Sequence, residues 1–358
     1  MNTGTTPFRA RFESLGWFLP ERKLTSEELM KSTKHKTGVD LEKLTGIHER
    51  RVCGDDENTY VLIKKAALDC LSFSKYKPED LEMLVVCNIS RYISKESNLN
   101  EPSLAVLIKE ELGANNAIAF DINNACAGML TGVYIVSDFI ERGIIKKGMV
   151  VSGENISSLN FNAARKVRTI ISPQIASLTV GDAGVAAILE RLQEGREKDG
   201  DGIIVSTFIT LSEYSHLCIG KPCHWGPGAS MFTNARMIHK VAIADSPPIL
   251  KKAFDKVGLS FTDIDYLIPH QTSERSILSG AMKLEKYFNQ SVKNLVVNLR
   301  EYGNTASTTH FVALNRYLRE GKFKKGDRIM LLSFASGLVI GIVFFKIDEL
   351  VEKYGHKN

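Results

Sequence analysis

Cys126 has the sequence neighbours of a nucleophile. It stands in the stretch NNACAGM, after an apolar run that predicts a strand over residues 117–120. Behind it, apolar positions at helical spacing predict a helix that ends at Gly143. A cysteine at a helix N-terminus meets unpaired backbone N–H groups and the positive end of the helix dipole, which favour thiolate over thiol. A lone cysteine is also an ordinary buried structural residue, so other parts of the chain must support the chemical interpretation.

Two internal repeats relate a histidine and an asparagine to this cysteine. ERGIIKKG at 141–148 matches REGKFKKG at 319–326, an offset of 178 residues that carries Cys126 onto Asn304. PEDLEMLVVCNIS at 78–90 resembles FTDIDYLIPHQTS at 261–273, an offset of 183 that carries Cys87 onto His270. Taken singly, His270 and Asn304 are everyday turn residues. At corresponding strand ends of two packed halves, we expect Cys126, His270 and Asn304 to meet at one point.

The repeats predict a duplicated α/β fold. Each half is expected to contain short apolar strands that are buried on both faces and covered by helices, with the halves related by a pseudo-twofold axis. Charge and glycine replace the apolar periodicity in RLQEGREKDGDG, so we expect an N-terminal half over residues 1–195 with the cysteine. The C-terminal half, residues 196–358, then carries the histidine and the asparagine.

Composition and charge exclude several classes of protein. The 358 residues are 24% charged and 44% hydrophobic with a formal net charge of +5, and they contain no long basic arm of the nucleic-acid-binding kind. The six cysteines have no disulfide-framework spacing and the start of the chain lacks a signal-peptide pattern, so we expect a cytoplasmic protein. The apolar run 329–345 is interrupted by ASG and predicts two buried strands, not a membrane span. The cysteines and histidines of HLCIGKPCH, residues 216–224, have poor spacing for zinc, and we expect no metal.

Five motifs resemble the β-ketoacyl-acyl carrier protein synthase III branch of the thiolase superfamily. The motifs are KLTGIHERRV (43–52), NNACAGM (123–129), TVGDAGVAAIL (179–189), LIPHQTSE (267–274) and EYGNTAS (301–307). The resemblance covers nearly the whole chain. It implies the thiolase fold with five αβαβα layers, a homodimer, no cofactor, and Cys126, His270 and Asn304 as the catalytic set.

The resemblance also implies a course of reaction. Cys126 would carry an acyl group as a thioester, and neutral His270 and Asn304 would donate hydrogen bonds to the enolate oxygen of a second thioester. The backbone N–H groups of Cys126 and Ser336 would form the oxyanion hole for the acyl carbonyl; many family members carry glycine at the second position. Glu154, at the end of the strand that follows the Cys126 helix, could serve as a general base if burial raises its pKa. A carboxylate that pairs with the backbone is the competing interpretation of Glu154.

Departures from the family pattern bear on the substrate. Asp40 and Leu44 stand where relatives that use acyl-coenzyme A carry a tryptophan and an arginine for the adenine nucleotide. We therefore expect thioesters on acyl carrier protein, with coenzyme A as the alternative carrier. Candidate docking residues are Arg165, Lys166 and Arg168, although a solvated charged surface is the competing interpretation.

The segment 90–112 is unusual for an enzyme that starts fatty acid synthesis. Together with Glu154 it resembles the ketosynthase/cyclase subgroup that forms 1,3-cyclohexanedione precursors of dialkylresorcinols and bacterial stilbenes. The alternative is a β-ketoacyl-acyl carrier protein synthase III that initiates fatty acid synthesis by decarboxylative condensation with malonyl-acyl carrier protein.

Two rival classes are disfavoured by the sequence. Papain-like hydrolases share the chain order of cysteine, histidine and asparagine, but they have no internal duplication. A catalytically inactive partner subunit would be expected to have lost Cys126, which is present.

Overall fold

Strands from two halves of the chain form two five-stranded mixed sheets. The computed structural model describes residues 8–94 and 97–355, and within these ranges the strand orders are β1-β7-β6-β4-β5 and β8-β14-β13-β11-β12. The first sheet contains β1 (Ala10–Phe18), β7 (Ala183–Arg191), β6 (Lys147–Glu154), β4 (Met83–Cys87) and β5 (Ile118–Ile122). The second contains β8 (Gly202–Thr210), β14 (Val339–Lys346), β13 (Arg328–Ala335), β11 (Tyr266–Pro269) and β12 (Asn294–Leu295).

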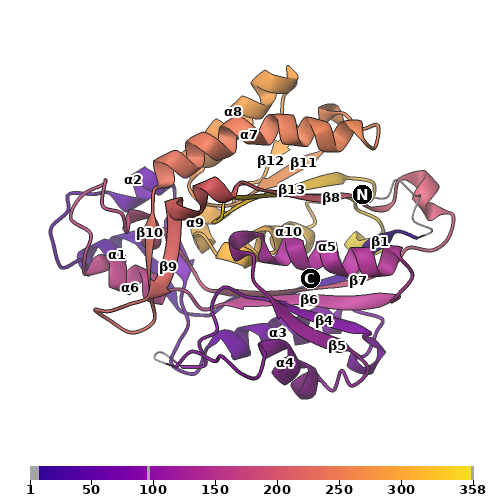
Figure 1. Cartoon of the computed structure of the whole chain (residues 1–358), viewed down its shortest axis with the longest axis horizontal. Helices are drawn as coiled ribbons and strands as arrows, with labels where there is room; N and C mark the ends of the chain where they lie inside the picture. The colour runs from indigo at the N-terminus through magenta and orange to yellow at the C-terminus, as the bar shows by residue number, and fades with distance from the viewer. Residues whose placement is uncertain (1–7, 95–96, 356–358) are drawn as a thin grey trace.

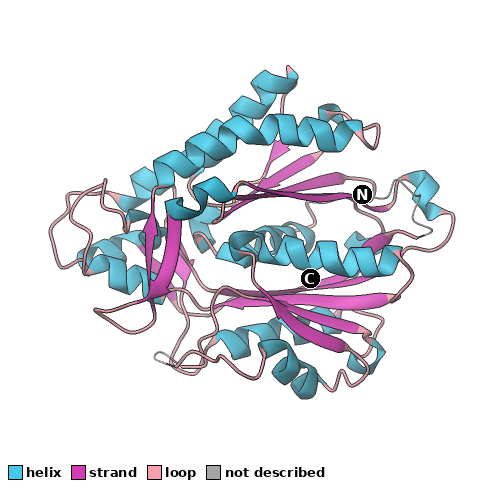
Figure 2. Ribbon diagram, in the orientation of Figure 1, coloured by secondary structure: helices cyan, strands magenta, loops and turns pink. Residues whose placement is uncertain are grey.

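Helices separate and cover the two sheets, as Figure 1 and Figure 2 show. Helices α5 (Gly128–Glu141) and α10 (Thr309–Arg319) lie between the sheets, and both contribute to a core cluster that draws on both sheets. Helices α3 (Thr59–Ser72) and α4 (Leu104–Leu112) cover the outer face of the first sheet. Helices α7 (Ala235–Asp255) and α8 (Glu274–Phe288) cover the outer face of the second. The five αβαβα layers confirm the predicted thiolase fold.

The smaller elements gather at one end of the molecule, on the left of Figure 1. They are β2 (Lys23–Thr25), α1 (Ser26–Lys31), α2 (Leu41–Thr45), β3 (Glu49–Arg51), α6 (Ser158–Ala164), β9 (Cys218–Pro222), β10 (Ala229–Thr233) and α9 (Leu299–Tyr302). β9 and β10 form an antiparallel hairpin, and β2 and β3 pair antiparallel across the helices α1 and α2.

Continuous apolar sequence produces the central strands. Every residue of β4 is buried, because β4 pairs in parallel with β5 and β6 and has helices on both faces. The apolar run 329–345 forms β13 and β14, an antiparallel pair, as predicted. In the described parts of the chain, no helix is both long and apolar enough to cross a membrane.

The two halves match each other element by element, but one of the predicted offsets is wrong at the site. The 310 turns Ala125–Ala127 and Ala306–Thr308 precede α5 and α10, and their first residues have φ of 47° and 53°. These turns are 181 residues apart, so the counterpart of Cys126 is Ser307 and the counterpart of Asn304 is Asn123. The matching stretches 141–148 and 319–326 come after the helices α5 and α10. Because α10 has 11 residues and α5 has 14, the offset between the two halves is 181 before these helices and 178 after them.

The second offset agrees with the sheet register. In the first sheet Met83 of β4 pairs with Gly148 of β6, and in the second sheet Tyr266 of β11 pairs with Ile329 of β13. These pairs occupy the same place in the two sheets, so Tyr266 is the counterpart of Met83 at an offset of 183 residues. His270 therefore follows β11 at the place where Cys87 ends β4. The predicted boundary between residues 195 and 196 falls in the connection from β7 to β8 and stays a prediction.

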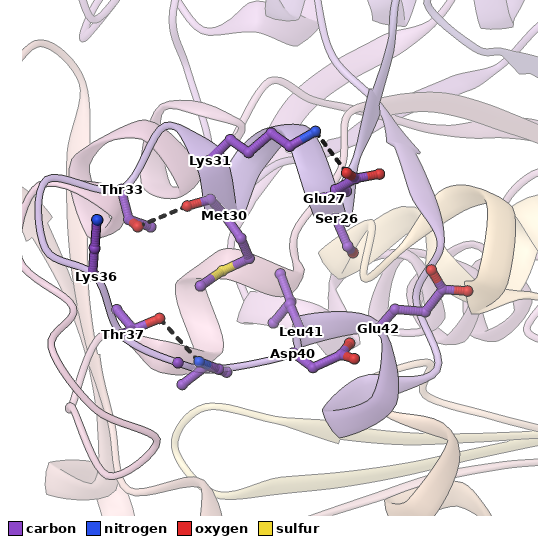
Figure 3. A pocket seen from close by; sticks show the side chains of 12 residues that line it. Ser26, Glu27, Met30, Lys31, Thr33, Lys36, Thr37, Asp40, Leu41 and Glu42 are labelled. Carbon is purple, nitrogen blue, oxygen red and sulfur yellow. Dashed lines mark hydrogen bonds and ion pairs between the residues drawn. The ribbon is translucent and has the colours of Figure 1, made fainter.

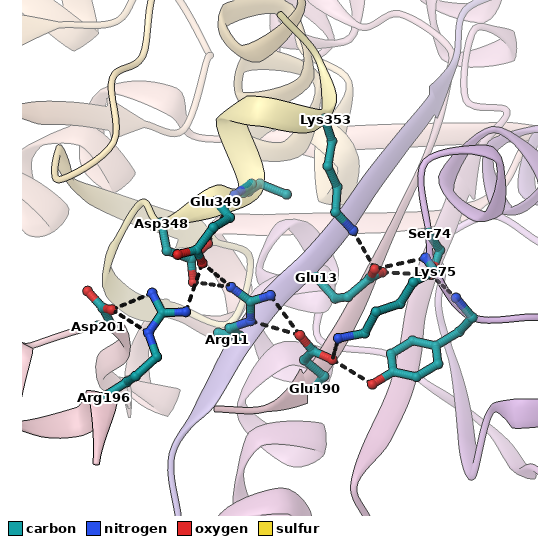
Figure 4. A network of polar contacts seen from close by, with 12 residues as sticks. Arg11, Glu13, Ser74, Lys75, Glu190, Arg196, Asp201, Asp348, Glu349 and Lys353 are labelled. Atoms are coloured by element: carbon teal, nitrogen blue, oxygen red, sulfur yellow. Dashed lines mark hydrogen bonds and ion pairs between the residues drawn. The ribbon is translucent and has the colours of Figure 1, made fainter. Parts of the chain in front are cut away.

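A polar network joins the two halves through β1 and the C-terminal segment, as Figure 4 shows. Arg11 of β1 contacts Glu190 at 2.8 Å, Asp348 at 2.6 Å and Glu349 at 2.9 Å. Arg196, in the β7–β8 connection, also contacts Glu349, at 2.8 Å. Because Arg11 and Glu190 are in the first half and the other acids in the second, this network resists separation of the halves.

Candidate active site

Cys126 lies in a tight turn directly before α5. Ala125 has φ of 47°, and the side-chain oxygen of Asn123 accepts a hydrogen bond from the Ala125 N–H at 3.1 Å. Gly132, one turn into α5, lets the helix pack closely on the sheet: a Cβ there would lie 2.4 Å from Val150 and 2.6 Å from the Cys87 sulfur. The buried face of α5 includes the predicted apolar positions 129, 130, 133, 136 and 140. The turn is thus held rigidly at the end of the sheet.

The surroundings of the Cys126 sulfur are apolar. Its side chain packs against Ile156, Leu159, Val180 and Ala306. Burial, followed by the nearby Cys218 and Glu154, raises the pKa of the Cys126 thiol above its ordinary value. The predicted lowering of this pKa by the helix N-terminus is therefore wrong: the pKa is raised, and burial of the sulfur is the largest cause. The resting form is the protonated thiol.

Asn304 lies in the turn that faces Cys126. Its backbone N–H donates to Thr179 at 2.9 Å, its carbonyl accepts from Gly181 at 3.0 Å, and its side-chain oxygen accepts from the Ala306 N–H at 3.0 Å. Ala306, in turn, packs in the cluster around Cys126. The turn around Asn304 is fixed by the TVGDAG segment of the first half.

His270 reaches the same region through β13. Its backbone N–H donates to the Leu332 carbonyl at 2.9 Å, and the next residue, Ser333, donates from its hydroxyl to the Cys126 carbonyl at 3.4 Å. The side chain is 5% exposed. Burial, and to a smaller extent His310, lowers the pKa of His270 to about 3, so its imidazole is neutral at physiological pH.

The loop after β13 lies beside the cysteine turn. Ala335 and Val339 pack against Ala125, Cys126 and Ala127. Ser336 follows Ala335 directly, so the segment predicted to complete the oxyanion hole borders the cysteine. The donation by the backbone N–H of Ser336 stays a prediction.

Glu154 is fully buried at the end of β6 and bonded on both oxygens. From the described residues, Oε1 accepts the Ile89 N–H at 2.9 Å and the Ser307 hydroxyl at 2.5 Å, while Oε2 accepts the N–H and the hydroxyl of Ser90, both at 3.0 Å. Burial raises the pKa of Glu154, and these hydrogen bonds oppose that rise. The carboxylate joins the loop after β4 to the turn before α10, and its role as a base stays a prediction.

Two polar residues at the site were missed from the sequence. Ser307, the counterpart of Cys126, contacts Ser152 at 2.8 Å as well as Glu154. His310, in the first turn of α10, is fully buried and lies against His270, with ring centroids 5.8 Å apart. Aligning the starts of the two central helices would have revealed Ser307. His310 could have been found from the sequence TTHFVALN, where it is a histidine on the apolar face of the predicted helix.

The segment HLCIGKPCH forms β9 and its flanks. The Cys218 sulfur lies 3.5 Å from the Thr233 hydroxyl, across the hairpin. Within residues 8–94 and 97–355, no three His, Cys, Asp or Glu side chains are grouped so that they could hold a metal ion.

A groove of about 630 Å³ opens beside α1 and α2 and contains Asp40 (Figure 3). Asp40 caps α2 by accepting the Lys43 N–H at 3.0 Å, and its carboxylate also pairs with the Lys43 ammonium. Among the described residues that line the groove, none is aromatic: they are Ser26, Glu27, Met30, Lys31, Thr33, Lys36, Thr37, Gly38, Val39, Asp40, Leu41 and Glu42. Leu41 packs against the end of α6. Leu159 of the same helix belongs to the cluster around Cys126. Helix α6 is thus one wall of the site, and the groove lies at the outer end of that wall. Leu44 is partly buried.

The unusual segment 90–112 starts at the Glu154 network and ends in α4. Ser90 donates to Glu154, and Arg91 pairs with Asp121 of β5. Residues 95 and 96 of this segment lie outside the described residues.

Two models of one family match the chain. The model described as 3-oxoacyl-[acyl-carrier-protein (ACP)] synthase III matches residues 120–210, and the model of its C-terminal part matches residues 254–347. These ranges contain the turns of Cys126, His270 and Asn304.

Curated relatives and solved structures agree with these models. β-Ketoacyl-[acyl-carrier-protein] synthase III of Clostridioides difficile is 31% identical over 349 residues, which cover 93% of this chain and 97% of the relative. OleA of Xanthomonas campestris, solved with cerulenin, shares the fold with a TM-score of 0.81 at 22% identity, over 97% of this chain and all of the other. The 3-oxoacyl-[acyl-carrier-protein] synthase III of Aquifex aeolicus has a TM-score of 0.78 at 24% identity, over 94% of this chain and all of the other.

Both the sequence matches and the architecture therefore lead to one conclusion. The chain belongs to the β-ketoacyl-[acyl-carrier-protein] synthase III family of the thiolase superfamily, and it is a condensing acyltransferase.

Proposed function

We propose that Cys126 accepts an acyl group from a carrier thioester and passes it to the α carbon of a second thioester. The observation that carries this proposal is the meeting of the Cys126 and Asn304 turns beside β13, to which His270 is bonded. In the first step the cysteine sulfur bonds to the acyl carbon, the carrier C–S bond breaks, and the thiol proton leaves with the carrier thiol. In the second step the α carbon of the second thioester loses a proton, or carbon dioxide in the decarboxylative alternative. A C–C bond then forms between this carbon and the acyl carbon, the Cys126–acyl bond breaks, and the sulfur recovers a proton.

The neutral imidazole of His270 and the amide of Asn304 serve this second step as hydrogen-bond donors. An enolate oxygen develops negative charge at the second thioester, and preorganised donors in a buried site stabilise such charge strongly. The backbone N–H groups of Cys126 and Ser336 do the same for the acyl carbonyl.

The carrier is proposed to be acyl carrier protein. A groove without aromatic residues offers no stacking surface for an adenine ring. Arg165, Lys166 and Arg168 follow α6, and among the described residues none of them has a carboxylate ion-pair partner; Ile170 and Ile171 beside them are 54% and 86% exposed. Arg165 donates to the Trp225 carbonyl and Lys166 lies over the Trp225 ring, so both keep their charge without a carboxylate partner. Such cations around exposed apolar side chains suit an acidic carrier protein.

A homodimer is proposed through the edge of the first sheet. β5 pairs on one side with β4 and is the last strand of the sheet, and its Ile118 is 58% exposed. An unpaired edge with apolar side chains is a surface that a second copy covers well.

The narrower proposal is that condensation ends in ring closure to a 1,3-cyclohexanedione, as in the ketosynthase/cyclase subgroup. It rests on the resemblance, the missing adenine clamp and Glu154, which would act as general base for the added deprotonation. The names of the curated relatives favour the alternative, a decarboxylative condensation with malonyl-acyl carrier protein.

The experiment is a two-stage incubation followed by mass spectrometry. An acyl-acyl carrier protein alone should give an acyl adduct on Cys126, and the Cys126→Ala variant should give none. A β-ketoacyl or a malonyl thioester is then added in separate reactions. A cyclic product from the β-ketoacyl thioester supports the cyclase. A linear product with release of carbon dioxide from the malonyl thioester supports the alternative, and absence of an adduct refutes both.

A further inference from the structure

His310 is a buried ionisable residue that the proposed reaction does not use. It occupies the second position of α10, is fully buried, and lies against His270 with the two rings tilted by 32°. Neither imidazole has a carboxylate partner among the described residues, so nothing compensates a positive charge on either ring.

One carbonyl ties the two histidines together. The Leu332 oxygen accepts the His270 backbone N–H at 2.9 Å and lies 3.1 Å from Nε2 of His310. A carbonyl can only accept, so Nε2 of His310 carries a proton and donates it. His310 therefore fixes the peptide group that holds His270 at the end of β11.

The buried ring nitrogens also determine the tautomers. Nδ1 of His270 and Nδ1 of His310 are both buried without a hydrogen-bond partner among the described residues. A buried N–H without a partner is rarer than a buried acceptor without one. The favoured tautomer of His270 thus has its proton on Nε2, the nitrogen left to meet a substrate.

We propose that His310 is a positioning residue that holds His270 in place, with the proton of the His270 imidazole on Nε2. This proposal rests on the proposed role of His270. Burial is the main cause of the lowered pKa of His270, and His310 adds to it.

Two variants separate the hydrogen bond of His310 from the packing of its ring. His310→Gln keeps an N–H donor for Leu332 but has no ionisable ring, and His310→Phe keeps a ring but no donor. We expect His310→Phe to lower the condensation rate about 5–10-fold, the effect of one lost hydrogen bond, without change in the acylation of Cys126. His310→Gln should keep the rate within about twofold at pH 7.

The decisive measurement is the titration of His270 by NMR of 15N-labelled histidine, with His270→Asn to assign its signals. In the wild type the His270 ring should remain neutral, with the proton on Nε2, from pH 8 down to pH 5. Because the pKa of His270 is about 3, the ring should stay neutral in both His310 variants over this range. The 15N shifts of the His270 ring should move in His310→Phe, which lacks the donor to Leu332, and stay close to wild type in His310→Gln. Unchanged 15N shifts of the His270 ring together with wild-type kinetics for His310→Phe would overturn the proposal. Failure of the wild type to form product refutes the proposed function instead, since the NMR titration does not depend on turnover.

Discussion

Replacing Glu154 by glutamine tests whether this carboxylate is a base or a structural acceptor. All four groups that contact it can donate, and two of them are the backbone N–H groups of Ile89 and Ser90. A glutamine presents one oxygen and one NH2, so in either orientation one of these two N–H groups faces a donor. The hydroxyls of Ser90 and Ser307 can rotate to accept, but a backbone N–H cannot. We therefore expect the free energy of unfolding to fall by about 1–3 kcal/mol, the cost of one unsatisfied buried donor.

Activity then separates the two roles. If Glu154 only holds the loop after β4 against the turn before α10, acylation of Cys126 and condensation should weaken together. If it is a general base, acylation should persist while the condensed or cyclic product falls by about 10²–10⁴-fold. The assays are denaturant unfolding, mass spectrometry of the Cys126 adduct and chromatography of the product. Glu79→Gln, on an exposed glutamate, is the matched control. A Glu154→Gln protein as stable as wild type would refute the hydrogen-bond argument.

Three further predictions concern reactivity, acid stability and assembly. Because burial raises the pKa of Cys126, its alkylation by iodoacetamide should accelerate about tenfold per pH unit from pH 7 to 9; a rate already constant below pH 7 would contradict this. Partial burial favours a higher pKa for Glu349, but hydrogen bonds from Arg196 and Lys325 outweigh it and lower the pKa to about 2. The contribution of the ionised Glu349 carboxylate to the free energy of unfolding is thus fully present above its ordinary pKa of 4.5. It is lost as the pH falls towards 2. In denaturant titrations, Arg196→Ala should cost up to about 1 kcal/mol at pH 7 and converge with wild type in acid; a gap independent of pH would disprove the link. Ile118→Lys should shift the protein from dimer to monomer in analytical ultracentrifugation while leaving its unfolding midpoint nearly unchanged; a dimer that persists would place the interface elsewhere.

Much of the fold follows from local sequence. The apolar runs of β4, β13 and β14 have the length and continuity of strands buried on both faces. That these strands are buried can be predicted without knowing which elements pack against them, because burial of apolar side chains is favourable whatever their apolar neighbours are. The α5 pattern and its Gly143 stop are equally local, and the predicted positions are the buried ones. The repeat placed His270 after a strand end because the offset of 183 falls within strands, where insertions are rare. The offset of 178 failed at Cys126 because three residues are missing from the helix that lies between the matched stretch and the site.

The sequence by itself determined the order of strands and helices, the duplication, and the turn that presents Cys126, because these depend on periodicity and on residues near in the chain. Only the tertiary structure decided the chemical state of the site. Burial raises the pKa of Cys126, where the sequence predicted that it would be lowered. Four hydrogen-bond donors from distant segments contact the Glu154 carboxylate. Helix α10 places His310 against His270. Desolvation and hydrogen bonding depend on which groups surround an atom from every side. Those groups are far apart in the chain: Ser307 lies 153 residues from Glu154, and Ser333 lies 207 residues from Cys126.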